Sequence, residues 1–172
     1  MVLSMTTDVQ RRAGMISVGP PDGPQVKVPA AYTITVTGDP PYDLRLGVTW
    51  DANLGRHTLH ELTITEQPDG VYVRMSQISQ IALAEIIERC LVGDVLGGPD
   101  GWQQLVADHA DDDPVAVDAL VYLLSHALGG QSPSATIAIA RGLSPASGPK
   151  RAAHARQAGL LPPAAEPGKA SG

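Results

Sequence analysis

The side chains best suited to bind a polyanion gather toward the C-terminal end of the chain. Residues 131–172 hold five Lys or Arg residues and one acidic residue, a balance of +4, whereas residues 1–130 hold seven cations and 17 anions, a balance of −10. Guanidinium and ammonium groups bind DNA phosphates and the acceptor edge of guanine. The uneven charge therefore favours a nucleic-acid contact in the C-terminal segment, although helix C-termini also attract Lys and Arg through the helix dipole.

Two groups of His and acidic residues have the donor types of a metal site but not its spacing. His57, His60 and Glu61 lie in a predicted strand, where an odd separation places the two imidazoles on opposite faces, so surface strand residues are the better interpretation. The acidic run Asp108–Asp113, which includes His109, lacks the regular alternation and the glycine of a calcium loop, and helix capping accounts for it. We expect no metal ion and no other cofactor.

The residue types of covalent catalysis also lack their usual context. Cys90 is the only cysteine and lies on the apolar side of a predicted helix, where it is most simply a small core residue. The sequence has no Gly-x-Ser-x-Gly motif, and the glycine-rich residues 93–101 lack the Lys-Ser/Thr of a phosphate-binding loop. We predict that the protein is not an enzyme.

Two short helices joined by a turn are predicted in the segment that carries the cations. Ser132 is a suitable N-cap, and Pro133 follows at the first helical position, where its missing N–H has no cost. Gly142 supplies a turn, and the second helix runs to Ala158 and stops at Gly159. This pattern is typical of a helix-turn-helix.

A set of spaced residues in this segment is similar to a known family pattern. The residues are Gly142, Leu143 and Ser144, followed by Ala155, Arg156, Gly159, Leu160, Leu161 and Pro162. They resemble the C-terminal helix-turn-helix of small actinobacterial and actinophage proteins to which DNA binding is ascribed. In that family the turn is Gly-Val-Ser and the second helix ends in Ala-Arg-x-x-Gly-Leu-Leu-Pro. A weaker similarity covers Tyr32 to Leu91. The resemblance implies an N-terminal β-rich domain and a C-terminal DNA-binding unit.

The start of the second helix departs from that family, which has Thr-Ala-Ala-Arg there. If the helix began at Pro145, then Pro149 would lie inside it and would cost about 3 kcal/mol. If Ser147 is instead the N-cap, the helix is short, from Gly148 to Ala158, and follows a longer turn. Either the helix meets DNA differently from the family, or the motif now only packs; both alternatives stay open.

The candidate DNA contacts lie on both helices of the predicted motif. The beginning of a recognition helix usually meets the base edges, and the first helix meets the backbone. From the first helix we select Ser134, Thr136 and Arg141, and from the second Ser147, Lys150, Arg151, His154 and Arg156, the last as a phosphate contact or a structural residue. Five apolar residues are assigned to the core of the unit: Ile137, Ala138, Leu143, Ala155 and Leu160.

The elements upstream must position this unit. Alternating apolar residues predict strands at 31–37, 44–50, 59–66 and 71–75, with short connections typical of an antiparallel sheet. An amphipathic helix capped by Ser76 and ending at Val92 is suited to cover one face of that sheet. Further helices are predicted at 102–109 and 115–128, the latter packing against the helix-turn-helix. The expected class is α+β, a four-stranded antiparallel sheet backed by a helix and followed by a C-terminal helical helix-turn-helix unit.

The organisation that we expect has four parts. They are a disordered arm at 1–29, a sheet-plus-helix domain at 30–98, a helical domain at 99–163 with its helix-turn-helix at 132–161, and a disordered tail at 164–172. The N-terminus has no signal-peptide h-region, and no run of 18 apolar residues occurs. We therefore expect a cytoplasmic protein that does not enter a membrane.

The function predicted from these features is sequence-specific binding of double-stranded DNA. The protein would be a small transcriptional regulator of an actinobacterium, its phage or a mobile element. A homodimer is expected because a single small DNA-binding module rarely supplies enough affinity. The alternative is a protein-interaction module, in which the acidic sheet domain binds a partner protein and the helix-turn-helix has lost DNA binding.

Overall fold

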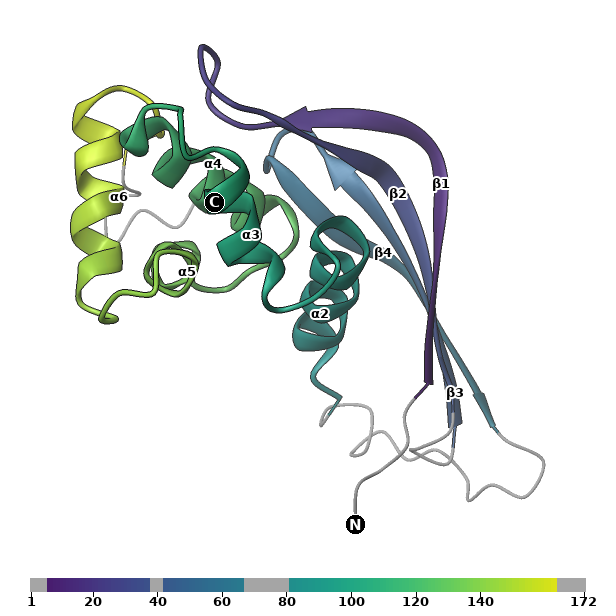
Figure 1. Ribbon diagram of the computed structural model, residues 1–172. Helices are drawn as coiled ribbons and strands as arrows, with labels where there is room; N and C mark the ends of the chain where they lie inside the picture. The colour runs from purple at the N-terminus through teal and green to yellow at the C-terminus, as the bar shows by residue number, and fades with distance from the viewer. Residues whose placement is uncertain (1–5, 38–41, 67–80, 164–172) are drawn as a thin grey trace.

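The computed structural model describes residues 6–37, 42–66 and 81–163 and has an antiparallel sheet followed by packed helices (Figure 1). Within these residues four strands pair in sequence order, each antiparallel to the next: β1 (Thr6–Val18), β2 (Val26–Thr37), β3 (Tyr42–Asp51) and β4 (Arg56–Glu66). The predicted α+β class, with an antiparallel sheet backed by a helix and followed by a helical unit, is confirmed.

Three of the predicted strands lie within observed ones. The ranges 31–37, 44–50 and 59–66 fall inside β2, β3 and β4. The predicted strand at 71–75 and the N-cap at Ser76 lie outside the described residues.

The strand β1 corrects the prediction that residues 1–29 form a disordered arm. It pairs with β2 along its length, and the register shifts between Arg12 and Met15. Before the shift Val9 pairs with Ile34 of β2, and after it Ile16 pairs with Val28. Both partners are buried. Because the bulge changes which alternate residues face the core, β1 has no continuous alternation by which the sequence could identify it.

Five helices are found in the described residues after the sheet. They are α2 (Leu83–Leu96), α3 (Gly101–Asp108), α4 (Pro114–Ala127), α5 (Pro133–Ala140) and α6 (Ser147–Gln157). The predicted helices at 102–109 and 115–128 correspond to α3 and α4 within a residue at each end. The Asp113 carboxylate caps α4 by accepting a hydrogen bond from the Val115 N–H at 3.2 Å, as its place before a helical proline indicated.

The helix α2 extends four residues beyond its predicted end at Val92. Gly93 lies inside the helix, so the predicted end at Val92 is wrong. The helix ends where Gly97 adopts a φ of 76° and donates its N–H to the Gly93 carbonyl. The helix therefore ends at a glycine in the left-handed conformation, about one turn after the predicted end at Val92.

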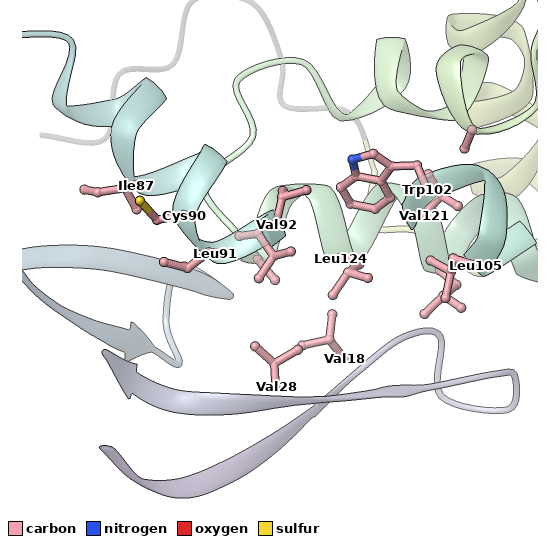
Figure 2. Close-up of a cluster of buried hydrophobic side chains, with 14 of the residues drawn as sticks. Val18, Val28, Ile87, Cys90, Leu91, Val92, Trp102, Leu105, Val121 and Leu124 are labelled. Carbon is pink, nitrogen blue, oxygen red and sulfur yellow. The ribbon is translucent and has the colours of Figure 1, made fainter. Parts of the chain in front are cut away.

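The core lies between one face of the sheet and the helices. Figure 2 shows Val18 and Val28 from the sheet opposite side chains of α2, α3 and α4, among them Leu91, Trp102 and Leu124. The same buried cluster continues into α5 and α6. One continuous core thus connects the sheet to the C-terminal helices, so the predicted division near residue 98 does not separate two cores.

His57 joins the sheet to α4 and is not the surface residue that the sequence suggested. It is 4% exposed, with Nδ1 2.8 Å from the Ala127 carbonyl oxygen and Nε2 2.9 Å from that of Pro29. The rings of Tyr32 and Trp50 meet it edge-on, with centroids 5.4 and 5.5 Å away. One imidazole therefore connects β4, β2 and the end of α4.

Candidate nucleic-acid interface

The helices α4, α5 and α6 pack against one another and form the C-terminal unit (Figure 1). After α5 the chain turns at Gly142, whose φ is 64°, and the Leu143 N–H donates to the Ala138 carbonyl at 2.9 Å. This bond closes the end of α5 in the way that a C-terminal glycine usually allows. A helix, a turn and a second helix therefore occur where the sequence predicted them.

The two residues that seemed to disrupt the second helix fit the observed geometry. At Gly148 an added Cβ would lie against the Ser134 carbonyl oxygen, so glycine permits the close approach of α5 and α6. Pro149 is the third residue of α6, where a helix has no internal acceptor for the N–H that proline lacks. The shorter-helix interpretation is confirmed, but the helix begins at Ser147 rather than after it.

Asp118 binds two of the predicted DNA-contacting arginines inside the unit. Its carboxylate, on α4 and 4% exposed, accepts hydrogen bonds from Arg141 Nε at 2.8 Å and Arg151 Nη1 at 2.7 Å. Arg141 also donates to the Pro114 carbonyl at 2.9 Å. A buried carboxylate requires such partners, so the structure uses these arginines to hold α4, the end of α5 and α6 together.

Thr136 and Arg156 are also engaged within the unit. Thr136 is buried, and its hydroxyl lies 2.9 Å from that of Ser125. Arg156 donates from Nη2 to the Tyr122 hydroxyl at 3.0 Å, with its guanidinium carbon 5.2 Å from the centre of the Tyr122 ring. The sequence pattern did not indicate Asp118 or Tyr122 as partners, because both lie in an apolar stretch of α4.

The remaining predicted residues lie at or near the surface of the unit. Lys150 and His154 are exposed, whereas Ser134 and Ser147 are half-buried, and the Ser147 hydroxyl lies 3.1 Å from that of Ser144. Within the described part of the chain, the side chains of Lys150 and His154 have no hydrogen-bonding or ionic partner. They are therefore free to meet a ligand.

Exposed residues at helical spacing form one continuous face of α6. Lys150, Ala153, His154 and Gln157 are all exposed at i, i+3, i+4 and i+7, and we call these four the outer face of α6. The opposite side of the helix is buried through Gly148, Ala152 and Ala155. Ala153 and Gln157 were not selected from the sequence, although their spacing from Lys150 and His154 could have identified them.

The predicted core residues of the unit mostly occupy the interior. Ile137, Ala138 and Ala155 are buried, and Leu160 is partly buried against the core. Leu143 is 41% exposed, so its assignment to the core is wrong. It lies just after Gly142 in the turn between α5 and α6.

Several of the His and acidic residues considered for metal binding have protein partners. His109 Nδ1 lies 2.7 Å from the Asp112 carboxylate, beside the capping Asp113. His57 is held by two backbone carbonyls. Among the described residues no three His, Cys, Asp or Glu side chains come together as a metal site would require.

Comparisons with models of protein families, with curated proteins and with solved structures find no match to this chain. In the described ranges, no helix is both long enough and apolar enough to cross a lipid bilayer.

Proposed function

We propose that the protein binds double-stranded DNA sequence-specifically through the outer face of α6, as a small transcriptional regulator of an actinobacterium, its phage or a mobile element. The observation that supports this most is the exposed stripe of Lys150, Ala153, His154 and Gln157 on the second helix of a helix-turn-helix. Lys can bind guanine, Gln can bind adenine through two hydrogen bonds, and the Ala methyl can contact the thymine methyl. The four side chains are therefore suited to read bases.

The charges around α6 predict how this binding would behave. Asp118 compensates one of the two arginines it holds, and the whole chain has a net charge of −6. Few free cations are left to bind phosphate, so we expect weak non-specific affinity and a modest salt dependence. Specific base contacts, doubled in a homodimer, would supply most of the affinity. Native mass spectrometry that finds only a monomer would contradict the dimer.

The test is selection of binding sites from a random duplex library, followed by fluorescence anisotropy on the selected site. Lys150→Ala and Gln157→Ala should each weaken binding by roughly 1–3 kcal/mol and should relax the preference at one base position. The matched control is Arg45→Ala, which removes the same charge from an exposed position of β3. Arg151→Ala is not a suitable variant, because it would disturb the Asp118 contacts.

The second candidate function is protein interaction through the acidic sheet domain. The observation that favours it is the internal use of Arg141, Arg151 and Arg156, which leaves Lys150 as the one permanently charged residue on the outer face of α6. A library that yields no enriched site, together with no anisotropy change at low salt, would favour this alternative over DNA binding.

A further inference from the structure

A pocket of about 710 Å³ is lined by residues of the β1–β2 connection and of the end of α6. Figure 1 shows this connection near the C-terminal end of α6, away from the turn that precedes the helix. Apolar residues form most of its wall, and among the described residues Arg156 is the one charged lining residue: the lining includes Pro21, Leu123, Arg156, Leu160, Leu161 and Pro162. Its volume is in the range of sites that hold small organic molecules. A molecule bound there would contact both the β1–β2 connection and the C-terminal unit.

The charge of Arg156 is not compensated by any described residue. Its guanidinium donates one hydrogen bond to the neutral Tyr122 hydroxyl and lies over the Tyr122 ring. The Nε atom is buried and has no hydrogen-bond partner. Arg141 and Arg151, in the same unit, both bind the Asp118 carboxylate. A half-buried arginine without an anion is unusual, because removing a charge from water is normally offset by an ionic partner.

We propose that this pocket binds a small organic acid whose carboxylate pairs with Arg156 and whose apolar body packs against Leu123, Leu160 and Leu161. The guanidinium is a planar fork of N–H donors suited to a carboxylate. Nε is buried and Nη2 donates one hydrogen bond to Tyr122, whereas the N–H groups of Nη1 and the second N–H of Nη2 have no described partner. The apolar wall disfavours a bare inorganic anion, which would lose its hydration there without gaining further hydrogen bonds. The site does not depend on the proposed DNA binding.

The experiment is a titration of the full ¹⁵N-labelled chain with hexanoate, followed through the backbone amides of Gly19 and Gly159, which line the pocket. Hexanamide, of the same size but uncharged, and inorganic phosphate are the comparison probes. We expect saturable shifts of both amides with hexanoate, and binding at least tenfold weaker with hexanamide or phosphate. Equal binding of acid and amide, or no shift of these amides with hexanoate, would overturn the proposal.

Arg156→Met keeps the apolar stem and removes the charge, and should weaken hexanoate binding at least tenfold, whereas Arg156→Lys should retain part of it. If Arg156→Met does not fold, Pro21→Glu provides the same test, since Pro21 is exposed on the rim of the pocket. The added carboxylate should abolish hexanoate binding, and Pro21→Gln should leave it intact. Unchanged hexanoate binding in Arg156→Met would show that Arg156 does not hold the ligand, and unchanged binding in Pro21→Glu would show that the ligand does not occupy this pocket.

Discussion

Asp118 carries a negative charge into the interior of the C-terminal unit, where two arginines from other segments bind it. Asp118→Ala would leave both guanidinium groups without their anion. We expect the free energy of unfolding to fall by about 3 kcal/mol. This value is the lower end of the range for breaking a buried ion pair, because both arginines are partly exposed. Urea denaturation followed by circular dichroism measures the loss.

The matched control for Asp118 is Asp111→Ala, which removes the same charge from an exposed position just before α4. It should change the free energy of unfolding by less than about 0.5 kcal/mol, as surface substitutions usually do. Similar losses in the two variants would show that the arginine contacts do not stabilise the unit.

Glu88 gives the molecule a pH-dependent stability. Burial on α2, and then the neighbouring charge of Glu85, raise the pKa of Glu88 above its ordinary value. Its contribution to stability is therefore complete below the ordinary glutamate pKa and is lost as the pH rises through the raised pKa. Glu88→Gln should increase the free energy of unfolding at pH 7, and this gain should disappear near pH 4.

Denaturation curves of Glu88→Gln at several pH values test this effect. The matched control is Glu61→Gln, which removes a carboxylate from an exposed position of β4 and, as a surface substitution, should change the free energy of unfolding by less than about 0.5 kcal/mol. If Glu88→Gln raises the free energy of unfolding equally at pH 4 and pH 7, the gain does not come from the ionisation of Glu88.

At the scale of elements, two helical glycines should respond oppositely to the same change. Gly148→Ala would place a Cβ against the Ser134 backbone and push α5 and α6 apart, with a loss of about 1–3 kcal/mol as for other overpacked sites. Gly93→Ala adds its Cβ in open space within α2 and should stabilise the protein by about 0.5–1 kcal/mol.

Thermal denaturation of the two alanine variants compares them directly. The change at Gly148 should also weaken any DNA binding, because it displaces the helix that carries Lys150. If Gly148→Ala were as stable as Gly93→Ala, the close approach of α5 and α6 would not be required.

At the scale of the whole molecule, the sheet and the helices share one core and should unfold together. His57→Phe keeps a ring between Tyr32 and Trp50 but removes the two ring nitrogens that lie against the carbonyl oxygens of Pro29 and Ala127. We expect a loss of about 1–3 kcal/mol for each carbonyl that becomes buried and unsatisfied. Equilibrium unfolding in urea, followed by far-UV circular dichroism and tryptophan fluorescence, measures this loss.

His60→Phe provides the comparison for His57→Phe, because His60 is exposed on the same strand. It should leave both unfolding transitions nearly unchanged. Separate transitions for the two probes in the wild-type chain would contradict a single cooperative unit.

The sequence by itself determined the elements that depend on local preferences. Apolar alternation indicated β2 and β3, the Asp113-Pro114 pair marked the start of α4, and glycines marked two helix ends that the structure has, with φ of 64° at Gly142 and 76° at Gly159. Each of these signals involves residues close in the chain, where backbone sterics and capping act. The α+β class followed from them.

Only the tertiary structure decided which side chains are available to a ligand. Arg141 and Arg151 looked like DNA contacts, but Asp118 binds them from 23 and 33 residues away in the sequence. Pairing with β2 likewise made a strand of β1, whose bulge hides its alternation. Strand pairing and charge compensation depend on partners that only the folded chain brings together, and no local pattern of residues encodes them.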